Sequence, residues 1–160
     1  MLKDGYFHTG DIGEFRDGFL FITDRKKELF KTSGGKYVAP QAVENALKES
    51  IFIEQCMVVG DGQKFPAALI VLDQILTKSK FPKFNNYSAK ELISEPEIIE
   101  AVHADILEIN KRFGNWEQVK SFRLLPQPFS IEKGEITPTL KLKRKKIIEI
   151  YSDLIQEMYV

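Results

Sequence analysis

Continuous apolar runs and helical periods alternate through most of the chain and predict a compact α+β unit. Two runs, 54–59 and 67–72, are apolar at nearly every position, which is typical of well-buried strands, and the Gly-rich stretch between them predicts a hairpin. A third strand is expected at 119–125, and shorter strands at 28–31 and 36–38. We therefore expect a short mixed or antiparallel sheet of about three main strands, flanked by helices.

Three amphipathic helices are expected around this sheet. The first covers 40–48 and begins with proline, a residue favoured at the first helical position. The second opens with Ser94 and Glu97, which have the spacing of a capping box, and continues with apolar residues at helical spacing over 98–113. The last helix carries an apolar face along 147–158.

The N-terminal residues follow a different pattern, with short extended segments and no helical period. Strands are predicted at 12–15 and 19–22, and the pair Asp17-Gly18 between them is a good hairpin signal. Two strands alone are marginal in water. The hairpin therefore needs a partner surface, which we expect a larger domain to supply.

A dense run of cations at 24–36 separates this hairpin from the α+β unit. Arg25 offers a rigid donor fork, and Lys27 and Lys31 offer point charges beside a loop whose backbone can approach a ligand closely. A solvated basic edge strand that blocks sheet-to-sheet pairing explains the same residues equally well. The loop consists of Ser33, Gly34 and Gly35.

Two further segments could carry chemistry. In Thr9-Gly10-Asp11 a glycine turn holds a carboxylate that could accept hydrogen bonds from a pair of hydroxyls, although this tripeptide is common in ordinary turns. In 137–144 a loop could deliver the ammonium of Lys141 to a phosphate or carboxylate oxygen. The rival interpretation of the second segment is a basic patch that contacts an anionic membrane or nucleic acid.

Composition narrows these choices. The 160 residues suit one domain with an appendage, and the 23 basic and 23 acidic residues cancel, so any anion site must be local. The single cysteine, Cys56, lies in an apolar run and is expected to be a buried, inert thiol. No apolar run approaches the ~20 residues needed to span a membrane, and together these features predict a cytoplasmic location.

Taken together, residues 6–11, 24–36 and 134–144 resemble, in order and spacing, the C-terminal motifs of AMP-forming acyl-CoA synthetases, and most closely those of long-chain fatty-acid–CoA ligases. The resemblance runs over nearly the whole chain. It implies that a fatty acid attacks ATP to give an acyl-adenylate and pyrophosphate, after which coenzyme A displaces AMP. The resemblance leaves peripheral contact with the inner membrane face open. It implies no nucleic-acid partner.

The resemblance implies a division of the chain within the adenylate-forming superfamily. Residues 1–24 would end a large N-terminal adenylation domain, 25–31 would form the hinge, and 32–160 would be a small C-terminal domain that swivels between the half-reactions. The large domain would be the main partner and would hold Mg²⁺, whose ligands are not expected in this chain. The chain alone should therefore not complete the reaction.

Residue roles follow from the same resemblance. Asp11 matches the carboxylate that binds the ribose hydroxyls of adenosine, Arg25 matches the arginine that contacts ribose and phosphate, and Lys27 falls at the hinge position. Lys31 falls at a position linked to thioester formation. The loop of Ser33, Gly34 and Gly35 matches the loop that enters the site beside the pantetheine path in the second step.

Lys141 matches the lysine that reaches the α-phosphate and carboxylate during adenylation. That lysine usually follows a glycine, whereas Leu140 precedes Lys141 here, so Lys143 remains a second candidate.

Overall fold

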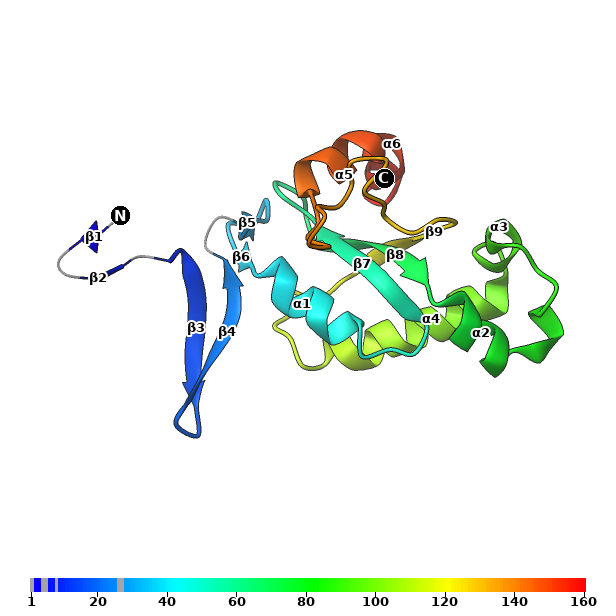
Figure 1. Cartoon of the computed structure of the whole chain (residues 1–160), viewed down its shortest axis with the longest axis horizontal. Coiled ribbons are helices and arrows are strands. Elements are labelled where there is room, and N and C mark those ends of the chain that lie inside the picture. The colour runs from blue at the N-terminus through cyan, green and yellow to red at the C-terminus, as the bar shows by residue number, and fades with distance from the viewer. Residues whose placement is uncertain (1, 4–5, 8, 26–27) are drawn as a thin grey trace.

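The computed structural model describes the backbone of residues 2–3, 6–7, 9–25 and 28–160, and the side chains of residues 9–22 and 28–160. Strands and helices follow one another as the apolar pattern predicts, with a hairpin first and the α+β unit after it (Figure 1). The elements are β1 (Leu2–Lys3), β2 (Tyr6–Phe7), β3 (Asp11–Arg16), β4 (Phe19–Arg25), β5 (Phe30–Lys31), β6 (Tyr37–Val38), α1 (Pro40–Leu47), β7 (Ile53–Val59), β8 (Ala67–Leu72), α2 (Gln74–Lys80), η1 (Pro82–Phe84), α3 (Ala89–Leu92), α4 (Pro96–Asn110), β9 (Ser121–Leu125), α5 (Arg144–Ile150) and α6 (Ser152–Glu157).

A three-stranded mixed sheet forms the centre of the α+β unit, in the order β7-β8-β9. Strands β7 and β8 pair antiparallel, and β8 pairs parallel to β9 through a long crossover that contains α2, η1, α3 and α4. All six residues of β8 are buried, because this strand is central and both faces of the sheet are covered. The predicted fold class, with its three main strands, is confirmed.

Alternate side chains of the strands feed two separate hydrophobic cores. Cys56 and Ile70 point into a core shared with α1 and α4, whereas Met57 and Leu69 point into a core shared with Ile147 of α5. Figure 1 shows α1 and α4 on one side of the sheet and α5 and α6 on the other. The sheet therefore fixes α1, which carries Glu44, and the start of α5, which carries Arg144.

The predicted capping box at Ser94 is wrong. Pro96 occupies the first position of α4, so the N-cap is Glu95, and its side chain makes no capping hydrogen bond. The hydroxyl of Ser94 instead donates to the carbonyl of Lys90, 3.1 Å away, at the end of α3. A capping box does form one helix earlier, between Ser88 and Glu91, which have the same spacing.

The two long helices also differ in extent from the prediction. Helix α4 ends at Asn110, whose side-chain amide donates to the Val119 carbonyl at 2.8 Å and accepts from the Val119 amide at 3.0 Å, which ties the helix end to the chain entering β9. The expected helix over 147–158 is divided into α5 and α6 at Tyr151, where φ is −106° and ψ is 22°. The apolar face nevertheless stays continuous, with Ile147 and Met158 in one core.

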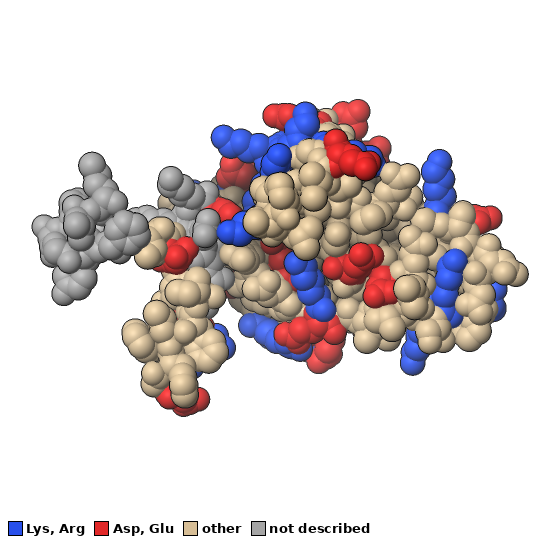
Figure 2. All heavy atoms as spheres, in the orientation of Figure 1, with Lys and Arg blue, Asp and Glu red and all other residues tan. Residues whose placement is uncertain are grey.

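Strands β3 and β4 form the predicted hairpin, which stands beside the α+β unit in Figure 1 and contacts α1 through β4. Asp17 and Gly18 both have positive φ, 49° and 84°, as a two-residue hairpin turn requires. The hairpin surface is mostly uncharged in Figure 2 and exposes several large apolar side chains. These are Phe15, Phe19, Leu20, Phe21 and Ile22.

Candidate active site

The loop that carries Lys141 is a closed turn, which we call the Lys141 loop (residues 136–143). Ile136 and Leu142 form an antiparallel bridge, the Thr137 amide donates to the Lys141 carbonyl at 2.8 Å, and the Leu140 amide donates to the Thr137 carbonyl at 2.8 Å. The Lys141 amide also donates to the Thr137 hydroxyl at 3.0 Å. The backbone of Lys141 is therefore held in place although its side chain is exposed.

Leu140 has a φ of 59°, a left-handed conformation that an L side chain rarely adopts and that glycine adopts freely. Its side chain is 73% exposed and gains little from packing. The residue before Lys141 thus keeps the backbone shape that suits glycine, although the sequence places leucine there. Leucine at position 140 is therefore held in a conformation that is strained for its own side chain.

The two candidate lysines line different pockets. Lys141 lines a polar pocket of about 220 Å³ beside α1, together with Gln41, Asn45 and Lys48. Lys143 lines a larger, more apolar pocket of about 710 Å³. The Lys143 amide donates to the Glu135 carbonyl at 2.8 Å, and Lys143 is the N-cap residue of α5. The side chains of Lys141 and Lys143 thus face different surfaces of the protein.

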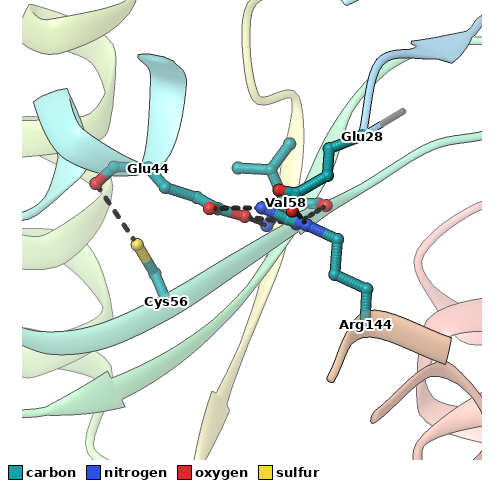
Figure 3. Close-up of polar contacts among 5 residues, drawn as sticks. All are labelled: Glu28, Glu44, Cys56, Val58 and Arg144. Carbon is teal, nitrogen blue, oxygen red and sulfur yellow. Dashed lines mark hydrogen bonds and ion pairs between the residues drawn. The ribbon is translucent and has the colours of Figure 1, made fainter. Parts of the chain in front are cut away.

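A buried ion pair lies directly after the Lys141 loop (Figure 3). Arg144, the first residue of α5, donates from Nη1 to Oε1 of Glu44 at 2.7 Å and from Nη2 to Oε2 at 2.6 Å. The amide of Val58 in β7 donates to the same Oε1 at 2.8 Å. The side chains of Glu44 and Arg144 are only 5% and 19% exposed. The three donated hydrogen bonds favour the ionised form of the Glu44 carboxylate, whereas its burial opposes that form.

Arg144 also reaches the segment that leads into β5. Its Nε donates to Oε2 of Glu28 at 3.3 Å, and its Nη1 lies 3.4 Å from the Val58 carbonyl. Figure 3 shows the guanidinium between Glu44 and Glu28, which approach it from different elements. One side chain therefore joins α1, β7, α5 and residue 28.

Burial and charge act in opposite directions at this ion pair. Burial raises the pKa of Glu44, and the hydrogen bonds and charge of Arg144 oppose that rise. Burial disfavours the charge of Arg144, but the carboxylates of Glu44 and Glu28 outweigh it and raise the pKa of Arg144. Burial, with the Glu44 charge second, raises the pKa of the nearby Cys56 thiol to about 12, in agreement with the predicted buried and inert cysteine.

Glu135 organises the other end of the Lys141 loop. This fully buried carboxylate accepts hydrogen bonds from the Tyr151 hydroxyl and the Ser130 amide, both at 2.8 Å. Burial, followed by the contact with Glu135, raises the pKa of Tyr151 to about 12. The loop is thus fastened to the bend between α5 and α6 as well as to α1.

The glycine loop lies against the turn between β7 and β8. Gly35 has a φ of 79°, and its amide donates to the Thr32 carbonyl at 2.9 Å, which closes the turn. The Ser33 amide donates to the Gln63 carbonyl at 2.8 Å. The ammonium of Lys31 lies 5.7 Å from the centre of the Tyr37 ring. Gly34 follows Ser33 in the same exposed turn.

Asp11 and Arg25 occupy one end of the hairpin. They are direct partners in the register of β3 and β4, so their backbones lie side by side. The Asp11 amide donates to the Thr9 hydroxyl at 3.1 Å, as expected of the glycine turn. Lys27 and the side chain of Arg25 lie outside the described residues.

The structure thus brings the segment 28–36 to the Lys141 loop through Glu28 and Arg144, whereas Asp11 belongs to the hairpin. Sequence reasoning assigned no role to Glu28, Glu44 or Glu135. A signal existed for Glu44, because it lies at helical spacing on the apolar face of α1 beside Val43 and Leu47, where an unpaired carboxylate would be costly. Its partner could not be identified, since Arg144 is 100 residues away.

Among the described side chains, no group of three or more His, Cys, Asp or Glu could hold a metal ion. The described helices likewise include none with the length and apolar character needed to cross a membrane.

Residues 28–160 match the family model described as the AMP-binding enzyme C-terminal domain. The chain is 39% identical over 160 residues to a long-chain-fatty-acid–CoA ligase of Mycobacterium tuberculosis, covering 98% of this chain and 27% of that protein. It is 38% identical over 178 residues to a long-chain-fatty-acid–CoA ligase of Gallus gallus, covering 98% and 23%. The chain thus spans about a quarter of the length of these curated relatives.

The fold has solved counterparts. The adenylation domain of a carboxylate reductase from Mycobacterium chelonae superposes with a TM-score of 0.77 at 22% identity, covering 98% of this chain and 23% of that one. At this identity the likeness concerns the fold alone. The family match extends over both the glycine loop and the Lys141 loop, and the chain accordingly belongs to the family of AMP-binding enzyme C-terminal domains.

Proposed function

We propose that this chain is the small C-terminal part of a long-chain fatty-acid–CoA ligase. In the first half-reaction a carboxylate oxygen of the fatty acid attacks the α-phosphorus of ATP, the bond to the β-phosphate breaks, and pyrophosphate leaves. In the second, the sulfur of coenzyme A attacks the acyl carbon, AMP leaves, and the thiol proton is released. The proposal is supported by the family match and by relatives that are long-chain-fatty-acid–CoA ligases.

Within this reaction we assign Lys141 the role of the adenylation lysine. Its ammonium would stabilise the negative charge that develops between the fatty carboxylate and the α-phosphate. The observation that carries this choice over Lys143 is the left-handed backbone of Leu140, a conformation that favours glycine, at the position where the resemblance implies a glycine before the adenylation lysine. Lys141 also lies beside α1 in a polar pocket, whereas Lys143 caps α5 and lines a more apolar one.

The remaining assignments divide the chain between two bodies. Residues 1–24 would belong to the large adenylation domain, 25–31 to the hinge with Lys27 as its pivot, and 32–160 to the mobile domain. The exposed apolar side chains of the β3–β4 hairpin support this division, because such a surface is stable only when another body covers it. Mg²⁺ would be held by the large adenylation domain.

The nucleotide and coenzyme A contacts would fall at opposite ends of the hinge. Asp11 and Arg25 would hold the ribose and its phosphate, which their shared position in the hairpin register supports. Ser33, Gly34 and Gly35 would line the pantetheine path, with Lys31 beside them. A swivel about 25–31 would then present the Lys141 loop in the first half-reaction and the glycine loop in the second.

A module that binds anionic membranes or nucleic acid through its basic segments is less well supported. Arg144, the arginine of the 141–146 basic stretch, is not part of a solvated patch but is paired with Glu44 and Glu28. Figure 2 likewise shows acidic and basic side chains interspersed over the visible face of the α+β unit.

The test compares Lys141→Ala with Lys143→Ala in a ligase of full family length that carries this chain as its C-terminal part. Acyl-adenylate formation should fall by about 10²-fold or more in Lys141→Ala and stay within about threefold of the parent in Lys143→Ala. Equal losses in the two variants would remove the assignment to Lys141. Gradual losses with each removed charge, with steep salt dependence, would favour the binding module.

A further inference from the structure

We propose that Arg144 is a positioning residue for the adenylation lysine: held by Glu44, it fixes the Lys141 loop against the proposed hinge segment through Glu28. This inference rests on the proposed function for the identity of the lysine. The positioning itself rests on contacts within the described residues.

The first support is the place of Arg144 in the chain. It follows the Lys141 loop immediately and starts α5, so it sits between a turn closed by backbone hydrogen bonds and a helix anchored in the core by Ile147. A side chain held at this junction sets the direction in which the loop enters α5. Lys141 lies only three residues before it.

The second support is the geometry of the ion pair with Glu44. Two parallel hydrogen bonds of 2.6 and 2.7 Å use the planar fork of arginine, a geometry that lysine cannot reproduce. The Val58 amide holds the same carboxylate from the opposite element at 2.8 Å. Glu44 is therefore held by the sheet and in turn holds the guanidinium of Arg144. Through Arg144, the end of the Lys141 loop is held in place as well.

The third support is the contact with Glu28. Glu28 follows the proposed hinge pivot and precedes Lys31, and its side chain is 38% exposed, far more than that of Glu44. Its 3.3 Å contact with Nε is also longer than those made by Glu44. Arg144 therefore has one buried partner that anchors it and one accessible partner on the segment that would turn during the swivel. The contact between Glu28 and Arg144 therefore links the proposed hinge directly to the end of the Lys141 loop.

The variants that test this are Arg144→Met, Arg144→Lys and the combination of Glu44→Gln with Arg144→Met, in the full-length ligase. The combined variant removes both charges while keeping an acceptor for the Val58 amide. Its stability should therefore recover, whereas Arg144→Met leaves a buried carboxylate without its cation. Arg112→Met is the matched control. It also breaks an Arg–Glu pair between distant segments, Arg112 with Glu49, but both side chains are more than half exposed.

Two readouts are needed. Adenylation by Arg144→Met and by the combined variant should fall by about 10²-fold, as a displaced catalytic group predicts. Hydrogen exchange at the amides of Leu140 and Lys141 should accelerate by about tenfold or more in both. Arg144→Lys should fall between these variants and the parent, and Arg112→Met should match the parent in both readouts.

The outcomes separate the two proposals. If the combined variant regains parental stability, adenylation and amide protection together, Arg144 has a structural role only and the positioning inference is overturned. Unchanged protection of the Leu140 and Lys141 amides in folded Arg144→Met would overturn it as well. Accelerated exchange in a ligase whose Lys141→Ala variant adenylates normally would leave the positioning intact and refute the proposed role of Lys141 instead.

Discussion

Arg144 and Glu44 form a bidentate ion pair, with contacts of 2.6 and 2.7 Å, between residues 100 positions apart in the sequence. The pair joins the first helix of the α+β unit to the helix that follows the Lys141 loop. Because Glu44 is buried and two of its three hydrogen bonds come from Arg144, the charged form of the carboxylate depends on that arginine.

Breaking this pair from one side should be costly. We expect Arg144→Met alone to lower the free energy of unfolding by about 3–5 kcal/mol, since it leaves a buried carboxylate without its cation. The combination of Glu44→Gln with Arg144→Met should lie within about 2 kcal/mol of the parent, because no buried charge remains. Urea denaturation of the three proteins measures both values. A combined variant as unstable as the single one would contradict the account.

Leu140 offers a test of backbone strain beside the proposed catalytic lysine. Leu140→Gly should be more stable than Leu140→Ala by about 1 kcal/mol, because both remove the exposed side chain but only glycine relieves the left-handed conformation. The comparison with alanine cancels the loss of the leucine side chain. Equal midpoints for the two variants in urea would mean that the loop relaxes at no cost.

Gly60 lies where the Phe30 ring packs on the end of β7. A Cβ at Gly60 would come within 2.9 Å of the Phe30 ring and 3.1 Å of the Phe65 carbonyl, and φ is 152°. Gly60→Ala should therefore lower the free energy of unfolding by about 2–3 kcal/mol. Gly62→Ala, with φ of 69° and no atom within 4 Å of its added Cβ, should lose only about 1 kcal/mol. Equal losses of stability for the two variants in thermal or urea denaturation would show that the Phe30 ring moves aside at no cost in free energy.

Stability should decrease at alkaline pH. Burial raises the pKa of Cys56 from 9.0 to about 12 and that of Tyr159 from 10.0 to about 12. As pH rises above about 9, the unfolded chain releases these protons while the folded chain retains them, so the free energy of unfolding falls. For Cys56 the slope approaches about 1.4 kcal/mol per pH unit.

Denaturation with urea at a series of pH values from about 8 to about 11 measures this slope, and Cys56→Ala isolates the cysteine's share. The variant should lose less stability over this range than the parent. Parallel curves for parent and variant would show that the thiol ionises in the folded protein as readily as in the unfolded one.

Much of the fold follows from local pattern, whereas the site depends on long-range pairing. Strand β8 and the second half of β7 are recognisable because strand residues buried on both faces of a sheet are apolar. The cap of α4 is not, because Ser94 and Glu97 have the spacing of a capping box, whereas Pro96 at the first helical position makes Glu95 the N-cap. The break at Tyr151 accompanies a hydrogen bond to Glu135, which no periodicity reveals.

The positions of the candidate site residues were open to prediction from their motifs, but their surroundings were not. The order of the motifs identifies Lys141 and the glycine loop as sites of interest, yet the clamp of Glu44, Arg144 and Glu28 exists only after α1, β7 and α5 meet on the sheet. Likewise, Leu140 gives no hint in the sequence that its backbone takes the conformation of glycine.

The division of labour between the two half-reactions is the central claim, and one variant tests it most directly. Lys141→Ala should abolish acyl-adenylate formation in the full-length ligase while transfer of the acyl group from supplied acyl-adenylate to coenzyme A stays within about threefold of the parent. Both rates can be measured on the same preparation by product formation. Equal loss of both half-reactions in a folded variant would contradict the account.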